Sequence, residues 1–139
     1  MNKLQVDRDY PLSEKRPELI YTPTGKKLSE INMDNVLKGT VNVEDCRISA
    51  QTLEYQAQIA ESAKNRQIAD NFRRAAELTA FPDEKLLEIY TALRPFRSTR
   101  EELLNLADEL EQGGASLNAE YVREAAVVYE KRRKFRGDK

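Results

Sequence analysis

The pattern of apolar residues changes near residue 48, and this change limits the folds that the chain can adopt. Residues 1–48 hold three of the five prolines and show no sustained helical or strand period. From residue 49 onward, apolar side chains recur every three or four residues, as one face of an α-helix requires. We therefore predict an all-α fold, in which an extended, mostly irregular N-terminal arm over residues 1–48 precedes a compact multi-helix domain over residues 49–139.

Start and stop signals divide the helical part into five segments. Ser49, Ser98 and Asn118 are the predicted N-caps of the first, fourth and fifth helices, and Ser98 with Glu101 matches a capping box. Pro82 is expected at the start of the third helix. The predicted helices cover residues 49–62, 65–79, 82–93, 98–112 and 118 to about 130, and a short helix is predicted over 33–38.

Each predicted helix carries one apolar stripe, and the stripes together form the predicted core. Its members are Leu53, Ala57, Ala60, Ile68, Phe72, Ala75, Ala76, Thr79, Leu103, Leu104, Ala107, Leu110, Val122, Ala125, Ala126 and Tyr129.

The sequence contains no histidine. Histidine is the commonest general base and metal ligand, so its absence excludes Ser/His and Cys/His nucleophile pairs and a helical di-iron site. The single cysteine, Cys46, cannot form an intrachain disulfide, and we interpret it as a small packing residue. We predict no catalytic, cofactor-binding or metal-ligating residue in this chain.

Acidic residues form three clusters on the predicted helices. An acid/base pair would need a pocket, whereas these positions lie at helix starts and on polar faces, so we interpret them as solvated side chains that complement helix dipoles. The clusters are Asp83/Glu84/Glu88, Glu101/Glu102 and Asp108/Glu109/Glu111.

A short segment, Thr24-Gly25-Lys26-Lys27, has a superficial likeness to a phosphate-binding loop. That loop needs a glycine five positions before Gly25 and a hydroxyl residue after the lysine. Position 20 is isoleucine and position 27 is lysine, so we predict a turn.

The C-terminal tail is basic: residues 131–139 carry six positive charges and one negative charge. Nucleic-acid binding is one interpretation. The other is that the cations complement a helix C-terminus and pair with an acidic protein surface. The net charge of the whole chain is -1, which favours the second interpretation, and we expect no nucleic-acid partner.

The N-terminal arm holds more large apolar side chains than a disordered tail usually does. We predict that residues 1–48 pack on a partner subunit through such anchors, and a free tail is the alternative. The candidate anchors are Tyr10, Leu12, Leu19, Ile20, Tyr21, Ile31, Val36 and Leu37.

Several segments follow the order of a known family. They are DYPL at 9–12, DCRIS at 45–49, NFRRAAEL at 71–78, PDE at 82–84, IYTALRPFRS at 89–98 and VREAA at 122–126. Over nearly its whole length, the chain resembles the small subunit of the adenosylcobalamin-dependent glycerol and propanediol dehydratases.

The resemblance implies a lyase built as a heterohexamer, with two copies each of a large, a medium and a small subunit. Such an enzyme converts glycerol to 3-hydroxypropionaldehyde and water, or propanediol to propionaldehyde. Adenosylcobalamin lies between the large and medium subunits, and the small subunit stabilises the large one without catalytic residues. An isolated small subunit is expected to be inactive.

Residues 21–26 and 51–57 look closer to the glycerol enzymes, so the predicted function is the small subunit of a glycerol dehydratase. The small subunit of a propanediol dehydratase is the first alternative, and a helical adaptor or nucleic-acid-binding protein is the second. The family has an apolar residue where Cys46 stands, which predicts a buried thiol.

Neither a signal peptide nor a membrane span is expected, because residues 1–10 lack an apolar run and no run approaches about 18 apolar residues. We predict a cytoplasmic protein with no membrane partner. Many propanediol enzymes carry an N-terminal extension that loads them into bacterial microcompartments. Only nine residues precede Tyr10, so we expect no loading through this chain, and the microcompartment is the alternative location.

Overall fold

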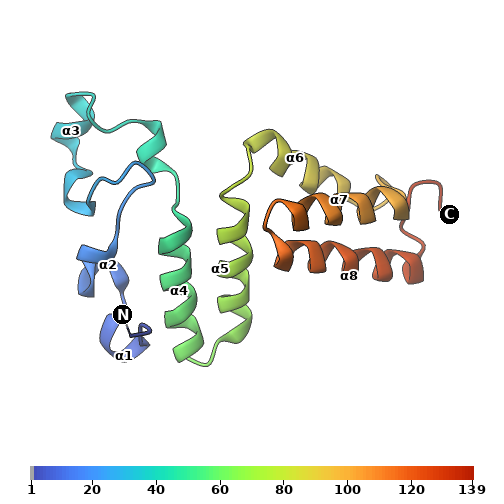
Figure 1. The fold of residues 1–139 in the computed structure, drawn as a ribbon, viewed down its shortest axis with the longest axis horizontal. Helices are drawn as coiled ribbons and strands as arrows, with labels where there is room; N and C mark the ends of the chain where they lie inside the picture. Colours follow the sequence, from blue (N-terminus) through green and yellow to red (C-terminus); the bar gives the residue numbers. More distant parts are fainter. Residues whose placement is uncertain (1) are drawn as a thin grey trace. The chain divides into compact units, whose positions relative to one another are not determined.

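The computed structural model describes residues 2–139, and it confirms the all-α prediction (Figure 1). Over that range there is no β-strand, only an isolated antiparallel bridge between Tyr21 and Lys27. The α-helices are α1 (Val6–Asp9), α2 (Leu12–Lys15), α3 (Met33–Leu37), α4 (Ala50–Ser62), α5 (Arg66–Leu78), α6 (Asp83–Ala92), α7 (Arg100–Gln112) and α8 (Ser116–Arg132). The 3-10 turns are η1 (Pro17–Leu19), η2 (Leu28–Glu30) and η3 (Val43–Cys46).

The chain divides into two compact units, Met1–Thr79 and Ala80–Lys139. We call them the first and the second unit. This division differs from the boundary at residue 48 that the sequence pattern indicated. The reason is that residues 4–20 pack on α4, and α4 in turn packs along α5. The N-terminal segment and these two long helices therefore form one unit.

The first unit is built around a hairpin of α4 and α5, which lie side by side in opposite directions (Figure 1). As predicted, Ser49 caps α4, because its Oγ accepts a hydrogen bond from the amide of Thr52 at 3.2 Å. Lys64 adopts a left-handed conformation at the turn between the helices. The Arg73 guanidinium also ties the pair together, since it contacts Glu54 at 3.3 Å and Glu61 at 3.0 Å.

The buried face of α5 is rotated from the predicted one. Ala69 is fully buried. Ile68, Ala75 and Thr79, which were predicted to lie in the core, are exposed. Packing against α4 decides which side of α5 is covered, and the apolar stripe is broad enough that periodicity alone did not select between the two sides.

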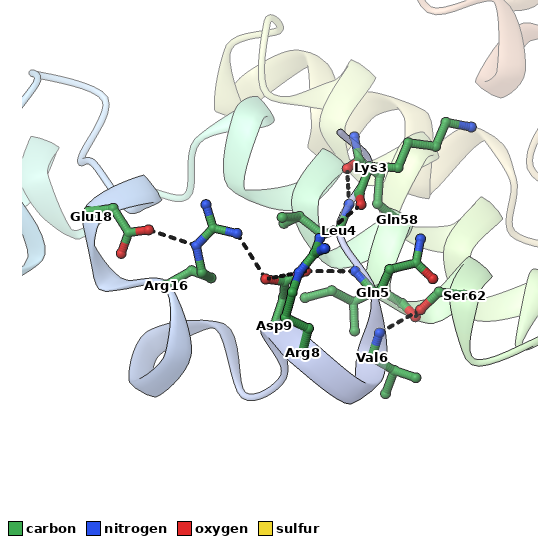
Figure 2. A network of polar contacts seen from close by, with 11 residues as sticks. Lys3, Leu4, Gln5, Val6, Arg8, Asp9, Arg16, Glu18, Gln58 and Ser62 are labelled. Carbon is green, nitrogen blue, oxygen red and sulfur yellow. Dashed lines mark hydrogen bonds and ion pairs between the residues drawn. The ribbon is translucent and has the colours of Figure 1, made fainter. Parts of the chain in front are cut away.

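Residues 4–20 pack on the other side of α4. Leu4 and Leu12 form a buried cluster with Ile59, and Val6, Leu19, Ile20 and Tyr55 pack against it. Two backbone amides of this segment also bond to α4 side chains: Leu4 N donates to Gln58 Oε1 at 3.1 Å, and Val6 N donates to Ser62 Oγ at 2.7 Å (Figure 2). The first residues of the described chain are therefore part of the first unit's own core.

The second unit contains a hairpin of α7 and α8 with α6 before it (Figure 1). Its core agrees in part with the predicted stripes: Leu103, Ala107, Leu110, Val122 and Ala126 are buried, whereas the predicted Leu104, Ala125 and Tyr129 are only partly buried. The other buried apolar side chains are Ile89, Leu106, Ala115 and Ala119. Gly113 ends α7 as predicted. A Cβ atom at Gly113 would lie 2.6 Å from the Phe81 ring, so a side chain at this position would force that ring to move.

Two predicted caps are displaced. Thr99, not Ser98, is the N-cap of α7: Thr99 Oγ1 accepts from Glu102 N at 3.2 Å, and the Glu102 carboxylate accepts from Thr99 N at 3.0 Å. Ser98 is buried and donates instead to the carbonyl of Ala92 at 2.8 Å. Helix α8 begins at Ser116, so Asn118 lies in its first turn and does not cap it. Both serine and threonine can cap, so the loop geometry decided between them.

Candidate functional site

A fully buried carboxylate, Asp9, organises the N-terminal end of the first unit (Figure 2). Its oxygens accept hydrogen bonds from Gln5 N at 2.8 Å, from the Arg8 guanidinium at 2.9 Å and from Arg16 Nη1 at 2.8 Å. Arg16 Nε also donates to Glu18 Oε1 at 2.6 Å. Glu18, Arg16, Asp9 and Arg8 thus form one chain of alternating charges.

These donors hold the pKa of Asp9 far below its usual range, with Arg8 as the main cause, followed by the Gln5 amide and Arg16. Such a carboxylate remains ionised and cannot act as a general acid near neutral pH. Because all its partners lie within residues 5–16, its role is to fix the fold of α1 and α2.

A second buried carboxylate, Asp45, closes the segment between residues 22 and 45. Lys26 Nζ lies 2.9 Å from Asp45 Oδ2, Thr22 Oγ1 donates to Oδ1 at 3.2 Å, and Thr24 Oγ1 also donates to Oδ1. The Asn42 amide donates to Oδ2 at 3.0 Å. The Thr24 hydroxyl, the Asn42 amide and Lys26 hold the pKa of Asp45 well below its usual range.

The segment that resembled a phosphate loop is a turn, as predicted. Thr22 N bonds to Lys26 O at 2.9 Å, and Gly25 N bonds to Thr22 O at 2.9 Å with Gly25 at a φ of +89°. The Lys26 ammonium is directed to Asp45, so the cation serves the chain's own carboxylate rather than a phosphate.

Around the Asp45 cluster, the first unit exposes apolar side chains. A groove is lined by residues that include Ile20, Tyr21, Leu28, Ile31 and Ile48. On α3 and η3 of the same segment, Leu37 is 78% exposed and Val43 is 76% exposed. We call the exposed residues Met33, Val36, Leu37, Val43 and Ile48 the apolar face. An exposed apolar cluster of this kind is typical of a protein contact surface.

The predicted anchors of residues 1–48 divide into two groups, apart from Ile31, which is partly buried in the lining of the groove. Leu12 is buried, and Leu19 and Ile20 pack against the core, so these three serve the chain's own fold. Tyr10, Tyr21, Val36 and Leu37 are exposed and remain available for a partner.

The second unit exposes further apolar side chains. Leu87 and Tyr90 on α6 are about two-thirds exposed. A hollow on α8 is lined by Leu93, Tyr121, Val128 and Tyr129, among others.

The three predicted carboxylate clusters are exposed, and several members form ion pairs within the second unit. Arg123 of α8 contacts Asp108 at 2.9 Å and Glu111 at 2.6 Å, so these carboxylates join α8 to α7. Lys85 of α6 pairs with Glu109. Within residues 2–139, no three His, Cys, Asp or Glu side chains are grouped as metal ligands. In the same range, no helix has the length and apolarity needed to cross a bilayer.

The expectation of a buried thiol at position 46 is wrong for this structure, since Cys46 is exposed. Asp45 beside it is buried and forms an ion pair with Lys26, whereas the next side chain of the same turn, Cys46, points outward. The contacts of Asp45 with Lys26, Thr22 and Thr24 therefore bury the carboxylate and leave the thiol outside.

Sequence reasoning missed both buried carboxylates as organising residues. One signal was present: Thr22, Thr24 and Lys26 alternate, so an extended or turn segment can direct all three side chains to one side. For Asp9, neither the adjacent arginine nor Arg16 differs in pattern from ordinary surface charges.

Comparison with known proteins extends over almost the whole chain. The family model for the dehydratase small subunit matches residues 5–136. The propanediol dehydratase small subunit of Citrobacter freundii is 50% identical over 131 residues, which cover 94% of this chain and 76% of that protein. The propanediol dehydratase small subunit of Salmonella typhimurium (strain LT2) is 52% identical over 131 residues, with the same coverage of each chain.

Proposed function

The chain belongs to the dehydratase small-subunit family, and from this membership we propose that it is the non-catalytic small subunit of an adenosylcobalamin-dependent diol dehydratase. The observation that carries the proposal is the identity of about half of the residues over 94% of the chain with two propanediol dehydratase small subunits. A dehydratase is a hydro-lyase, so the chain is a component of an enzyme.

For the substrate, we propose 1,2-propanediol as the first candidate, because both relatives are named for propanediol dehydratase. Glycerol, which residues 21–26 and 51–57 favoured, is the second candidate. Those two segments have roles in this chain's own scaffold: the first forms the turn that closes on Asp45, and the second lies in α4. Their sequence can therefore follow the packing of the small subunit rather than the substrate.

The proposed role is to supply contact surface to a large catalytic subunit, in a heterohexamer with two copies each of large, medium and small subunits. The apolar face supports this role, because full burial of one such side chain is worth about 1.5–3 kcal/mol. We propose that the outer side of residues 1–48, which includes Tyr10, Tyr21 and the apolar face, contacts that subunit. Adenosylcobalamin would be bound by the large and medium subunits, and this chain would contribute no catalytic, cofactor-binding or metal-ligating residue.

Reconstitution with the large and medium subunits from the same source tests the proposal. The tagged small chain should co-purify with both, and the complex with adenosylcobalamin should convert 1,2-propanediol to propionaldehyde and water. Turnover of glycerol to 3-hydroxypropionaldehyde, measured in parallel, decides the substrate preference. Activity of the purified small chain alone, or failure to bind either larger subunit, would contradict the proposed function.

We propose the cytoplasm as the location, with the bacterial microcompartment as the alternative. Fractionation of the source cells distinguishes the two, because an encapsulated complex would sediment with the microcompartment shells.

A further inference from the structure

One end of the second unit brings together two segments that lie far apart in the sequence. Phe96 N donates to Lys134 O at 2.8 Å, and Arg136 N donates to Ser98 O at 2.9 Å. The loop after α6 and the tail after α8 are therefore joined by two backbone hydrogen bonds, one at Phe96 and one at Ser98.

Side chains hold the same two segments in place. The Tyr129 hydroxyl donates to the carbonyl of Leu93, and the Tyr129 and Phe135 rings meet edge to face with centroids 6.3 Å apart. The Lys134 ammonium lies 5.0 Å from the centre of the Phe96 ring. The surface that these segments form is thus built by tertiary contacts and is not a loose tail.

This surface carries several positive charges that have no ion-pair partner in the described chain. Five of its cations are exposed, and within residues 2–139 none of the five forms an ion pair: Arg94, Arg97, Lys131, Arg132 and Arg133, which we call the basic end. By contrast, Arg100 and Arg136 beside them pair with Glu130 at 3.8 Å and with Glu102 at 2.7 Å.

The dipole of α8 does not account for the whole cluster. Lys131 and Arg132 lie in the last turn of α8, where cations are favourable. Arg94 and Arg97 belong to the loop after α6, so the dipole of α8 does not explain their position next to the tail. Unpaired cations that come together from two segments indicate a surface adapted to a negatively charged partner.

We propose that the basic end docks on an acidic surface of a larger subunit of the dehydratase, and this inference rests on the proposed function. Phe96, about half exposed among the arginines, adds the combination of aromatic and arginine residues that is enriched at protein interfaces. A nucleic-acid partner fits less well, because nucleic-acid-binding domains are usually basic overall, whereas this chain has a pI of about 5.7.

The test uses the reconstituted complex with adenosylcobalamin. The variant Arg94→Gln/Arg97→Gln/Arg132→Gln removes three charges from the basic end. The control Lys64→Gln/Arg66→Gln removes two exposed charges at the turn between α4 and α5, outside both proposed contact surfaces. The charge-preserving variant Arg94→Lys/Arg97→Lys/Arg132→Lys separates charge from side-chain shape. Circular dichroism checks that all variants keep the helical fold.

Binding of the small chain to the complex of large and medium subunits is measured at about 50 mM and about 500 mM salt. At low salt, the basic-end variant should associate roughly tenfold more slowly than the wild type, and the difference should vanish at high salt. The control and the lysine variant should stay within about twofold of the wild type, since they keep the charges of the basic end.

Other outcomes overturn the inference without ambiguity. If the wild type assembles and the basic-end variant assembles equally fast at low salt, the basic end is not the docking surface. If the variant assembles normally but loses retention of a single-stranded RNA or DNA oligonucleotide, the partner is a nucleic acid. Salt-sensitive self-association of the wild type, abolished in the variant, would identify a second copy as the partner. If the wild type binds neither larger subunit, the proposed function itself fails.

Discussion

Both units of this chain are built around a pair of antiparallel helices, but they complete that pair in different ways. In the second unit, a short connection through Gly113 and Gly114 joins α7 to α8, and leucine, valine and alanine side chains of the two helices form the core. In the first unit, α4 and α5 are accompanied by an N-terminal segment without a regular period, which the buried carboxylates Asp9 and Asp45 hold in place together with the buried Leu4 and Leu12. Repeated apolar contacts thus specify one unit, and a few specific polar contacts complete the other.

The comparison shows which contacts a sequence pattern can reveal. Residues of a helical hairpin meet neighbours near in sequence, so a 3.6-residue period identifies them. The N-terminal segment depends on distant pairs, such as Leu4 with Gln58, 54 residues apart, and Thr22 with Asp45, 23 residues apart. No local pattern connects such pairs.

The largest loss of stability is expected when a buried leucine of either unit is replaced by alanine. Leu12→Ala in the first unit and Leu110→Ala in the second should each lower the free energy of unfolding by about 2–5 kcal/mol, because each leaves a cavity. Amide hydrogen exchange should show faster opening of the unit that carries the substitution.

Exposed leucines provide the controls for that pair. Leu37→Ala in the first unit and Leu87→Ala in the second should change the free energy of unfolding by less than about 0.5 kcal/mol in the isolated chain. If Leu12→Ala were as mild as Leu37→Ala, the N-terminal segment would not be part of the first unit's core.

The next largest effect is expected from acid, which should destabilise the first unit at a higher pH than the second. The pKa is lowered for Asp9, Glu18, Asp45 and Glu61 of the first unit and for Glu102 of the second, and the lowering is largest for Asp9 and Asp45. A carboxyl with a lowered pKa binds fewer protons in the folded state than in the unfolded state. Its contribution to stability is therefore complete above the ordinary carboxyl pKa near 4 and is lost as the pH falls further.

We therefore expect amide spectra recorded from about pH 6 to pH 2 to change first for residues of the first unit. The double variant Asp9→Asn/Asp45→Asn should already be loosened at pH 6 and should lose most of the pH dependence of that unit. Simultaneous changes in both units, or an unaltered pH dependence in the double variant, would show that these carboxylates do not set the difference.

A smaller effect is expected at the start of α7, where the sequence indicated the wrong cap. Thr99→Ala should lower the free energy of unfolding by about 0.5–2 kcal/mol and speed hydrogen exchange at the Glu102 amide, which Thr99 Oγ1 binds. Ser98→Ala should leave that amide protected and should instead loosen the loop bonded to Ala92. The reverse pattern of protection would restore Ser98 as the cap.

The smallest effect is expected at Cys46. Because its side chain is exposed, Cys46→Val should change the free energy of unfolding by less than about 0.5 kcal/mol. The variant should also assemble with the larger subunits and support full dehydratase activity. An assembled but inactive complex would instead indicate chemistry at the thiol.

Much of the candidate contact surface could be predicted from the sequence, although the sequence did not show which parts lie together. The excess charge of residues 131–139 is visible in composition, and so are the apolar residues Val36 and Leu37. The sequence did not show that Arg94 and Arg97 join the tail, because that depends on the backbone bonds of Phe96 and Arg136. Nor did it separate Leu12, which serves the core, from Tyr10, which faces outward.

The sequence by itself determined the helices from residue 49 onward, the family, and the lack of any residue set built around histidine. Helix formation depends on spacing, capping and proline or glycine stops within a few residues, so these features can be inferred locally. The tertiary structure alone decided that Ala69 rather than Ile68 faces α4, that Thr99 rather than Ser98 caps α7, and that Asp45 rather than Cys46 is buried. In each case two neighbouring residues were locally acceptable, and contacts with a distant segment selected one of them.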